Sequence, residues 1–274
     1  MKGDKTQGLL EFCIEAQRSV TELQQRLFPL PEMRSQSEKY LEKNWLALNT
    51  PPAGNTGGAV ALAKFVKKGN FAQAPECILE PEFFKRMAPK NECPGMEAVV
   101  QSCETTKPEI AACMLPPGFW LREHWTAHEE PLLLEFAQHL ARRNALFLRT
   151  GFLSSEFEVH ESVLMGFRGI VLYATLLDEF QIQFLTEVCR DFKTCLVWAV
   201  DSEETLKRVL KTDAPYLSIA ALPNEKGERN LSFLQKMIPK IPNTCPRVAV
   251  LPGAKPHEVS YAQAAGYACV VGSV

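Results

Sequence analysis

The sequence lacks a long apolar run, an excess of one charge and a paired-cysteine motif, and each absence excludes a class of protein. No stretch approaches the roughly 18–20 apolar residues that cross a bilayer, so we expect no membrane insertion. The 30 basic and 32 acidic residues nearly cancel, to a net charge of −2, which argues against a nucleic-acid binder. The N-terminus also lacks the apolar core of an export signal.

The cysteines and the missing motifs narrow the chemistry further. The nine cysteines are odd in number and contain no CxxC pair, which favours buried, reduced thiols over a disulfide framework or a zinc site. We therefore expect an intracellular protein of a reducing compartment, either the cytoplasm or an organelle matrix such as that of the mitochondrion. There is no P-loop, no GxSxG and no GxGxxG after a first strand, so no cofactor and no metal are predicted.

The apolar segments alternate with amphipathic ones in a regular rhythm. The predicted strands are apolar throughout, which is typical of a parallel sheet covered on both faces. They fall at 60–66, 109–115, 145–150, 169–177, 194–200, 216–222, 247–251 and 268–271. Eight strand–helix units predict a (β/α)8 (TIM) barrel over residues 59–274, preceded by an N-terminal helical extension and loop over 1–58. A doubly wound open sheet is the rival architecture.

The given sequence stops directly after the eighth predicted strand, and we expect a barrel without its eighth helix. We expect the outer face of strand eight to be apolar and uncovered. Either the N-terminal helices or another protein subunit would then dock on this flank.

Several strings, in the same order along the chain, resemble indole-3-glycerol phosphate synthase. VALAKFVKK (60–68) is similar to the family's first strand, IAEVKxxSPS, and ALFLRTGF (145–152) is similar to its third, PVLRKDF. LVWAVDSEETLKRVL (196–210) is similar to LVEVHDEEELERAL, and AAGYACVVGSV (264–274) is similar to the eighth strand with its phosphate turn. The resemblance implies a barrel with an N-terminal helical extension. In this family the barrel closes an indole ring, with loss of carbon dioxide and water.

The acid and base groups that the resemblance implies are largely replaced. The general-acid Lys and the Asp of the third strand fall at Thr150 and Gly151. The other replaced positions are Phe65 in the first strand, Trp198 in the fifth, Ala220 and Leu222 in the sixth, and Leu251 and Pro252 in the seventh. Only the first-strand Lys survives, as a vestigial Lys67, and Phe152 keeps an aromatic side chain after the third strand.

The phosphate site that the resemblance implies is better preserved. Its positions are Asn70, Gly253, Gly272 and Ser273. Glycine amides cradle anions well, so a weak phosphate ligand is possible. The alternative is that both glycines serve only the turns in which they lie.

Two functions remain open. The first is a catalytically degenerate barrel that acts as a structural or accessory subunit of a larger complex. The second is a divergent indole-3-glycerol phosphate synthase or another barrel enzyme for a phosphorylated ligand. A scaffold predicts a barrel mouth plugged by Phe65, Trp198, Leu222 and Leu251, whereas an enzyme predicts convergent polar groups there. His160 and Glu161 are expected on the surface of a helix.

Overall fold

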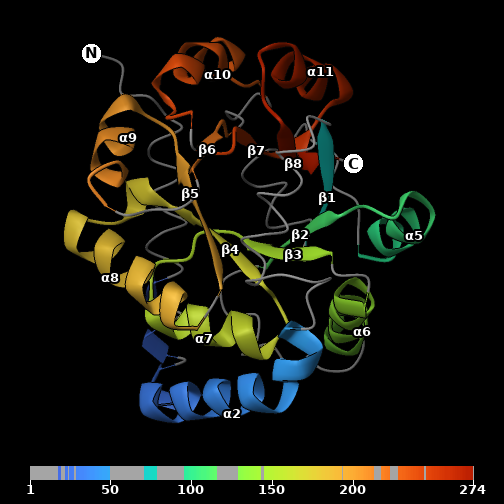
Figure 1. The fold of residues 1–274 in the computed structure, drawn as a ribbon, viewed down its shortest axis with the longest axis vertical. Coiled ribbons are helices and arrows are strands. Elements are labelled where there is room, and N and C mark those ends of the chain that lie inside the picture. Colours follow the sequence, from blue (N-terminus) through green and yellow to red (C-terminus); the bar gives the residue numbers. More distant parts are fainter. Residues whose placement is uncertain are drawn as a thin grey trace.

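The computed structural model describes residues 18–19, 22–23, 25–27, 29–49, 71–78, 96–115, 129–142, 145–192, 194–212, 217–222, 228–243 and 245–273. Parallel strands follow one another in sequence order around a closed barrel (Figure 1), which confirms the predicted (β/α)8 architecture. The strands are β1 (Ala72–Ile78), β2 (Ile110–Met114), β3 (Leu146–Thr150), β4 (Gly169–Tyr173), β5 (Cys195–Val200), β6 (Leu217–Ala220), β7 (Val248–Ala254) and β8 (Cys269–Ser273).

Helices cover the outside of this ring (Figure 1). They are α2 (Leu30–Asn49), α5 (Met96–Thr106), α6 (Glu129–Arg142), α7 (Glu156–Leu164), α8 (Glu179–Asp191), α9 (Glu203–Val209), α10 (Leu231–Met237) and α11 (Pro256–Ala264), with 3-10 turns η2 (Ala174–Leu176) and η3 (Ile238–Lys240). Among the described helices, none is both long enough and apolar enough to traverse a bilayer.

The first strand is not where the sequence pattern placed it. Its position in the ring is taken by β1, residues 72–78, whereas the predicted 60–66 segment lies outside the described residues. The sequence of β1, AQAPECI, has no continuous apolar run because Gln73, Pro75 and Glu76 interrupt it. Ala72 and Ala74 share the inner face with Glu76, and all three are buried. The strand was missed because each of its faces carries a polar residue, Glu76 on the inner face and Gln73 on the outer.

The pairing register defines which residues face the barrel axis. Side chains alternate along each strand, and paired residues of parallel strands lie on the same face. Glu76 pairs with Ala112, and Ala112 with Leu148. On the opposite face, Ala111, Cys113 and Phe147 pack with residues of α5 and α6 in a separate core. The inner face is tightly filled: a Cβ added at Gly169 would lie 2.4 Å from Leu148 Cδ2.

The predicted bare flank at strand eight is absent. Cys269, Val270 and Val271 of β8 are each at most 1% exposed, and β8 pairs with β1 on one side and β7 on the other. Helix α11 packs against β8. The exposed outward side chain beside Val270 is the polar Gln73. The structure therefore gives no support to docking on an apolar strand-eight surface.

The N-terminal extension contributes α2, which lies along α7 on the outside of the barrel (Figure 1). Pro29 precedes this helix, and its carbonyl accepts the amides of Glu32 and Met33. Ser37 is fully buried, and its hydroxyl lies 3.3 Å from the carbonyl oxygen of His160 in α7. The extension and the barrel thus share a packed, hydrogen-bonded contact.

Candidate functional site

A buried carboxyl group lies near the carboxyl end of β1, where barrels place their functional groups. Glu76 is 2% exposed, and its Oε1 accepts a hydrogen bond from the hydroxyl of Thr150, the last residue of β3. Its Oε2 has no partner among the described residues. One oxygen of this carboxyl group is therefore buried without a hydrogen-bond partner among the described residues.

The environment of Glu76 raises the pKa of its carboxyl group into the neutral range. Burial raises the pKa of Glu76 to about 7, because the carboxylate loses its hydration. The Thr150 hydrogen bond and the positive charge of Arg229 oppose this rise. A carboxyl group that titrates near pH 7 can give or take a proton at physiological pH, the property that barrel enzymes use in acid–base steps.

A second unpartnered polar atom belongs to Tyr173, the last residue of β4. Its side chain is 1% exposed, and its hydroxyl has no partner among the described residues. The ring is held by Phe152, whose centroid lies 5.5 Å away in a stacked arrangement. Burial raises the pKa of Tyr173, and the negative charge of Glu76 raises it further, so the phenol stays protonated. We call Glu76, Thr150 and Tyr173 the mouth cluster.

The guanidinium group of the nearby Arg229 is held by hydrogen bonds to three acceptors of the protein. Its Nε lies 3.2 Å from Glu258 Oε2 in α11, its Nη1 donates to the carbonyl of Ala221 at 2.7 Å, and its Nη2 donates to the carbonyl of Pro252. Glu258 lies in α11, Ala221 directly follows β6 and Pro252 belongs to β7. Arg229 therefore connects three neighbouring elements. It also contributes a fixed positive field to the mouth cluster.

The opposite half of the mouth is apolar. Tyr173 pairs with Ala199, Ala199 with Ser218, Ala220 with Val250, and Val250 with Val271. On the axis-facing side, the register places Ala199, Ala220, Val250 and Val271 in β5 to β8, and none of these can exchange a proton. The mouth cluster itself comes from β1, β3 and β4, and Asp201, directly after β5, adds a negative charge that acts on Tyr173.

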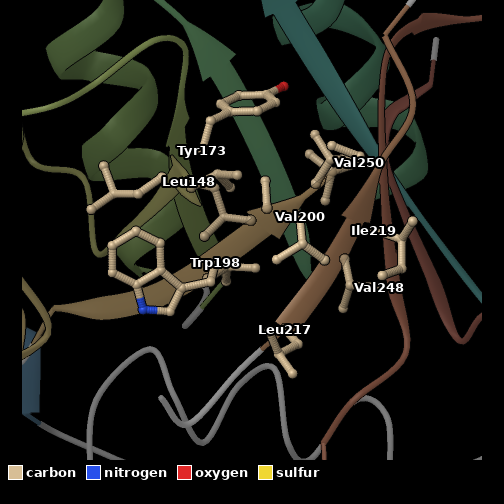
Figure 2. Close-up of a cluster of buried hydrophobic side chains, with 14 of the residues drawn as sticks. Leu148, Tyr173, Trp198, Val200, Leu217, Ile219, Val248 and Val250 are labelled. Carbon is tan, nitrogen blue, oxygen red and sulfur yellow. The ribbon is translucent and has the colours of Figure 1, made fainter. Parts of the chain in front are cut away.

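Trp198 does not plug the mouth. Its indole Nε1 lies 3.3 Å from the hydroxyl of Thr186 in α8, so the ring points into the helix layer. In Figure 2 the indole nitrogen of Trp198 and the hydroxyl of Tyr173 point in opposite directions. The scaffold hypothesis predicted that Trp198 fills the barrel opening, and this is wrong, because Trp198 pairs with the outward-facing Leu172 rather than with an inward residue. At this residue the structure counts against the scaffold hypothesis. Leu251 is fully buried and Leu222 is half-buried, and Phe65 lies outside the described residues.

The glycines predicted to hold phosphate have a demonstrable packing role. Gly272 has a φ of 107°, and a Cβ added there would lie 2.3 Å from the carbonyl oxygen of Leu251. Gly253 has a φ of 63° and lies where the β7–β8 register shifts. Ser273 ends β8 and pairs with Ala254. These turns require glycine without any ligand, so phosphate binding stays a prediction. Asn70 and Lys67 lie outside the described residues.

The observed β1 also changes the alignment with the synthase string. Ala74–Ile78 carries a Glu inside the observed first strand, as the string IAEVK does. Lys67 lies outside the described residues, so its assignment stays a prediction. The signal was present in the sequence as a Glu inside a strand-like segment, but the apolar 60–66 run was the stronger strand signal.

A second buried polar region lies outside the barrel, around α7. His160 is fully buried and Glu161 is 1% exposed, so the prediction of surface positions is wrong. Arg149 of β3 points outward to this helix, with its Nη2 2.6 Å from Glu161 Oε2 and its Nη1 2.9 Å from the hydroxyl of Ser162. Arg34 of α2 pairs with Glu156, and His160 Nε2 lies 3.2 Å from the same carboxylate.

Glu158 completes this region. Its Oε2 accepts hydrogen bonds from the amides of Ser154 and Ser155, at 2.7 and 3.0 Å, and so caps the start of its own helix. Burial raises the pKa of Glu158 to about 7, against the opposing charge of Arg149. We call the side chains that share these contacts the α7 layer: Arg34, Arg149, Glu156, Glu158, His160 and Glu161.

Comparison with known proteins supports a partial likeness to the synthases. No protein-family profile matches the chain. Indole-3-glycerol phosphate synthase of Legionella pneumophila (strain Lens) is 27% identical over 96 residues, which cover 34% of this chain and 37% of that protein. The synthase of Desulforamulus reducens is 26% identical over 109 residues, 39% of this chain and 41% of that protein. The chain thus matches well under half the length of these relatives.

Solved structures agree on the fold. The 3-hexulose-6-phosphate synthase of Salmonella typhimurium superposes with a TM-score of 0.53 at 10% identity, over 74% of this chain and 89% of that one. The YdjI aldolase of Escherichia coli K12 superposes with a TM-score of 0.51 at 12% identity, over 79% of each chain. At such low identity the likeness establishes the barrel fold and nothing about the reaction.

Proposed function

We propose that this chain is an indole-3-glycerol-phosphate-synthase-like barrel that does not catalyse ring closure and acts as an accessory or structural subunit. One observation carries the proposal. The third strand ends at Thr150, at the position where the resemblance implies a general-acid ammonium group. The hydroxyl of Thr150 donates a hydrogen bond to Glu76. A buried hydroxyl does not replace that group, because an alcohol is far too weak an acid.

The remaining strand ends support the same conclusion. Ala199, Ala220 and Val250 offer no charge to a reacting ligand, and the Arg229 guanidinium is held by Glu258 and by two carbonyls. Loss of one acid or base group typically costs a factor of ~10²–10⁴ in rate. Several such losses together would leave the ring closure ineffective.

An exposed aromatic pair on α8 supports a subunit role. Phe180 is 77% exposed and Phe184 is 39% exposed, with parallel rings whose centroids are 6.5 Å apart. An ion pair of 2.9 Å between Glu179 and Lys211 joins the start of α8 to the end of α9. Large apolar side chains that gather on a surface favour contact with another protein.

The proposal is tested by an activity assay and by the native assembly state. We expect no ring closure of the carboxyphenylamino sugar phosphate, with the Legionella pneumophila synthase as the positive control, and no rescue of a tryptophan auxotroph that lacks this enzyme. We expect the native protein to co-elute with other chains at fixed stoichiometry. Phe180→Glu should release it, whereas Gln183→Glu, which adds the same charge at an exposed neighbouring position, should not.

The second candidate, a divergent synthase or another barrel enzyme for a phosphorylated ligand, is favoured by Glu76. A buried carboxyl group with a pKa near 7 and a free oxygen is suited to proton transfer. Measurable turnover that disappears in Glu76→Gln would establish this candidate and refute the first. A monomer without partners in native extract would also refute the subunit role.

A further inference from the structure

Exposed apolar side chains gather at one place on the outside of the barrel. Among the described residues, three of the five exposed large apolar side chains lie on α8 or directly after α9. These are Phe180, Phe184 and Leu210, at 77%, 39% and 44% exposure. Single exposed apolar side chains are ordinary, but a group of them on adjoining helices favours contact with another molecule. We call these three side chains the aromatic patch.

Two contacts join the end of α9 to the start of α8, and the two helices adjoin on one side of the ring (Figure 1). Arg208 Nη1 donates to the carbonyl of Leu177 at 2.7 Å, and Lys211 Nζ lies 2.9 Å from Glu179 Oε2. Leu210 lies between Arg208 and Lys211 in the sequence, so it belongs to the same junction. The aromatic patch therefore spans two helices that the protein joins.

The exposed face of α8 has an apolar half and an acidic half. Four exposed residues share this face, because they follow the helical spacing i, i+4, i+7 and i+11: Phe180, Phe184, Glu187 and Asp191. The two phenylalanines come first, with parallel rings, and the two acids follow. Arg190 is rotated by about 100° from Asp191 around the helix axis, so it lies off this face.

The end of α9 carries the opposite charge. Lys207 and Lys211 are exposed, and they are four residues apart on either side of Leu210 in the sequence. The exposed Glu204 lies at the start of α9, away from the junction. From α9 to the end of α8, the surface is therefore basic, then apolar, then acidic. A surface with this order is complementary to a second copy of itself in the reverse direction.

We propose that the aromatic patch is the contact surface of a symmetric dimer, and that its occupant is a second copy of this chain. In a two-fold contact, residue i of one copy meets residue j of the other, and the reverse. With the two α8 helices antiparallel, Phe180 of each copy meets Phe184 of the other. The lysines of each junction then face Glu187 and Asp191 of the other copy. The dimer names the partner in the proposed subunit role, and it rests on that role for the use of the patch as a contact surface.

The charges disfavour other occupants. A uniformly basic partner would be repelled by the lysines of the junction, and a uniformly acidic one by Glu187 and Asp191. A second copy presents both signs in the required order. Each copy contributes far fewer side chains than the about 20–30 residues of a stable interface, so the dimer is weak and depends on concentration.

Sedimentation velocity on the purified full chain, from about 1 to 200 μM, tests the proposal. We expect monomer at the low end and dimer at the high end. Phe180→Ala should weaken dimerisation by about tenfold or more, and the side chain that it shortens is too exposed to support the core. Glu135→Lys is the control for a change on another helix: this exposed residue of α6 lies on the other side of the ring, and the dimer should change by less than about twofold.

A charge exchange identifies the occupant. One variant carries Glu187→Lys and Asp191→Lys, and a second carries Lys207→Glu. Each alone should dimerise more weakly than wild type, because like charges then meet in both halves of the contact. An equimolar mixture should recover most of the dimer, because opposite charges meet again. Only direct contact between these surfaces of two copies gives this recovery.

Three results would overturn the dimer: a monomer over the whole concentration range, a dimer that Phe180→Ala leaves unchanged, and a mixture that associates no better than its components. A chain that is monomeric alone, but is held by a different protein in native extract and released by Phe180→Glu, would also overturn it and would leave the subunit role standing. Ring closure by a chain that passes the charge exchange would support the dimer and refute the proposed function.

Discussion

The mouth cluster and the α7 layer are both buried and polar, yet they treat their charges differently. In the α7 layer Arg149 meets Glu161, and Arg34 and His160 meet Glu156. In the mouth cluster Glu76 has one hydroxyl partner and no cation in contact, and Tyr173 has no polar partner among the described residues. One buried polar region of this barrel therefore pairs its charges, and the other does not.

The difference lies in how the buried charges are compensated. Paired charges in the α7 layer fix the position of α2 and α7 against the outside of the barrel. Two buried side-chain nitrogen atoms of its described members, Arg149 Nε and His160 Nδ1, lack a hydrogen-bond partner. In the mouth cluster, Glu76 Oε2 and the Tyr173 hydroxyl are buried without a hydrogen-bond partner among the described residues.

The largest expected effect comes from breaking the α7 layer. Arg149→Met should lower the free energy of unfolding by about 3–5 kcal/mol, because it leaves buried carboxylates without their cation. Urea unfolding at pH 7 measures this. The control is Lys211→Met, which breaks an exposed pair with Glu179 and should cost less than about 1 kcal/mol. Equal effects of the two variants would refute a structural role for the layer.

A smaller effect concerns the pH dependence of stability. The pKa of Glu76 is raised from 4.5 to about 7 in the folded chain, so the folded state binds this proton more tightly than the unfolded state does. Its contribution is fully present below pH 4.5 and is lost as the pH rises to about 7, at up to ~1.4 kcal/mol per pH unit.

Urea unfolding at pH 5, 6, 7 and 8 checks this, with Glu76→Gln as the comparison. Glu158 has the same raised pKa, and the lowered pKa of His160 acts in the opposite direction, so the difference between wild type and variant isolates Glu76. The variant should gain stability relative to wild type from pH 5 to pH 8. A constant difference across this range would contradict the raised pKa.

The smallest expected effect is the sharpest test of the comparison. Tyr173→Phe should change the free energy of unfolding by less than about 0.5 kcal/mol, because the hydroxyl that it removes has no partner among the described residues. Tyr267→Phe loses a buried hydrogen bond to Leu234 and should cost about 1 kcal/mol. Reversed magnitudes would show that Tyr173 has a structural partner after all.

Apolar strands were predictable from the sequence, and mixed ones were not. The expected 145–150 and 194–200 segments are close to β3 and β5, because residues buried on both faces leave a continuous apolar run. β1 escaped prediction because its inner face carries Glu76 and its outer face carries Gln73. The candidate site depended on that strand, so its main residue was missed together with it.

The α7 layer escaped prediction for a different reason. A helix that reads EFEVHESVL has the composition of a solvated surface, yet all residues from Glu156 to Val163 are buried. The partner that makes this possible, Arg34, lies 122 residues away in the sequence from Glu156. Local patterning carries no information about a contact at that separation.

The closure of the ring has a consequence for assembly. β1 pairs with both β2 and β8, so every described strand has a neighbour on each side and no row of backbone amides and carbonyls is left unpaired at a sheet edge. Another polypeptide cannot extend this sheet by strand addition, the route by which open sheets recruit extended segments or aggregate. A partner protein must therefore bind to side chains on the helices and loops of this barrel. Substitutions there can change binding specificity without altering the sheet.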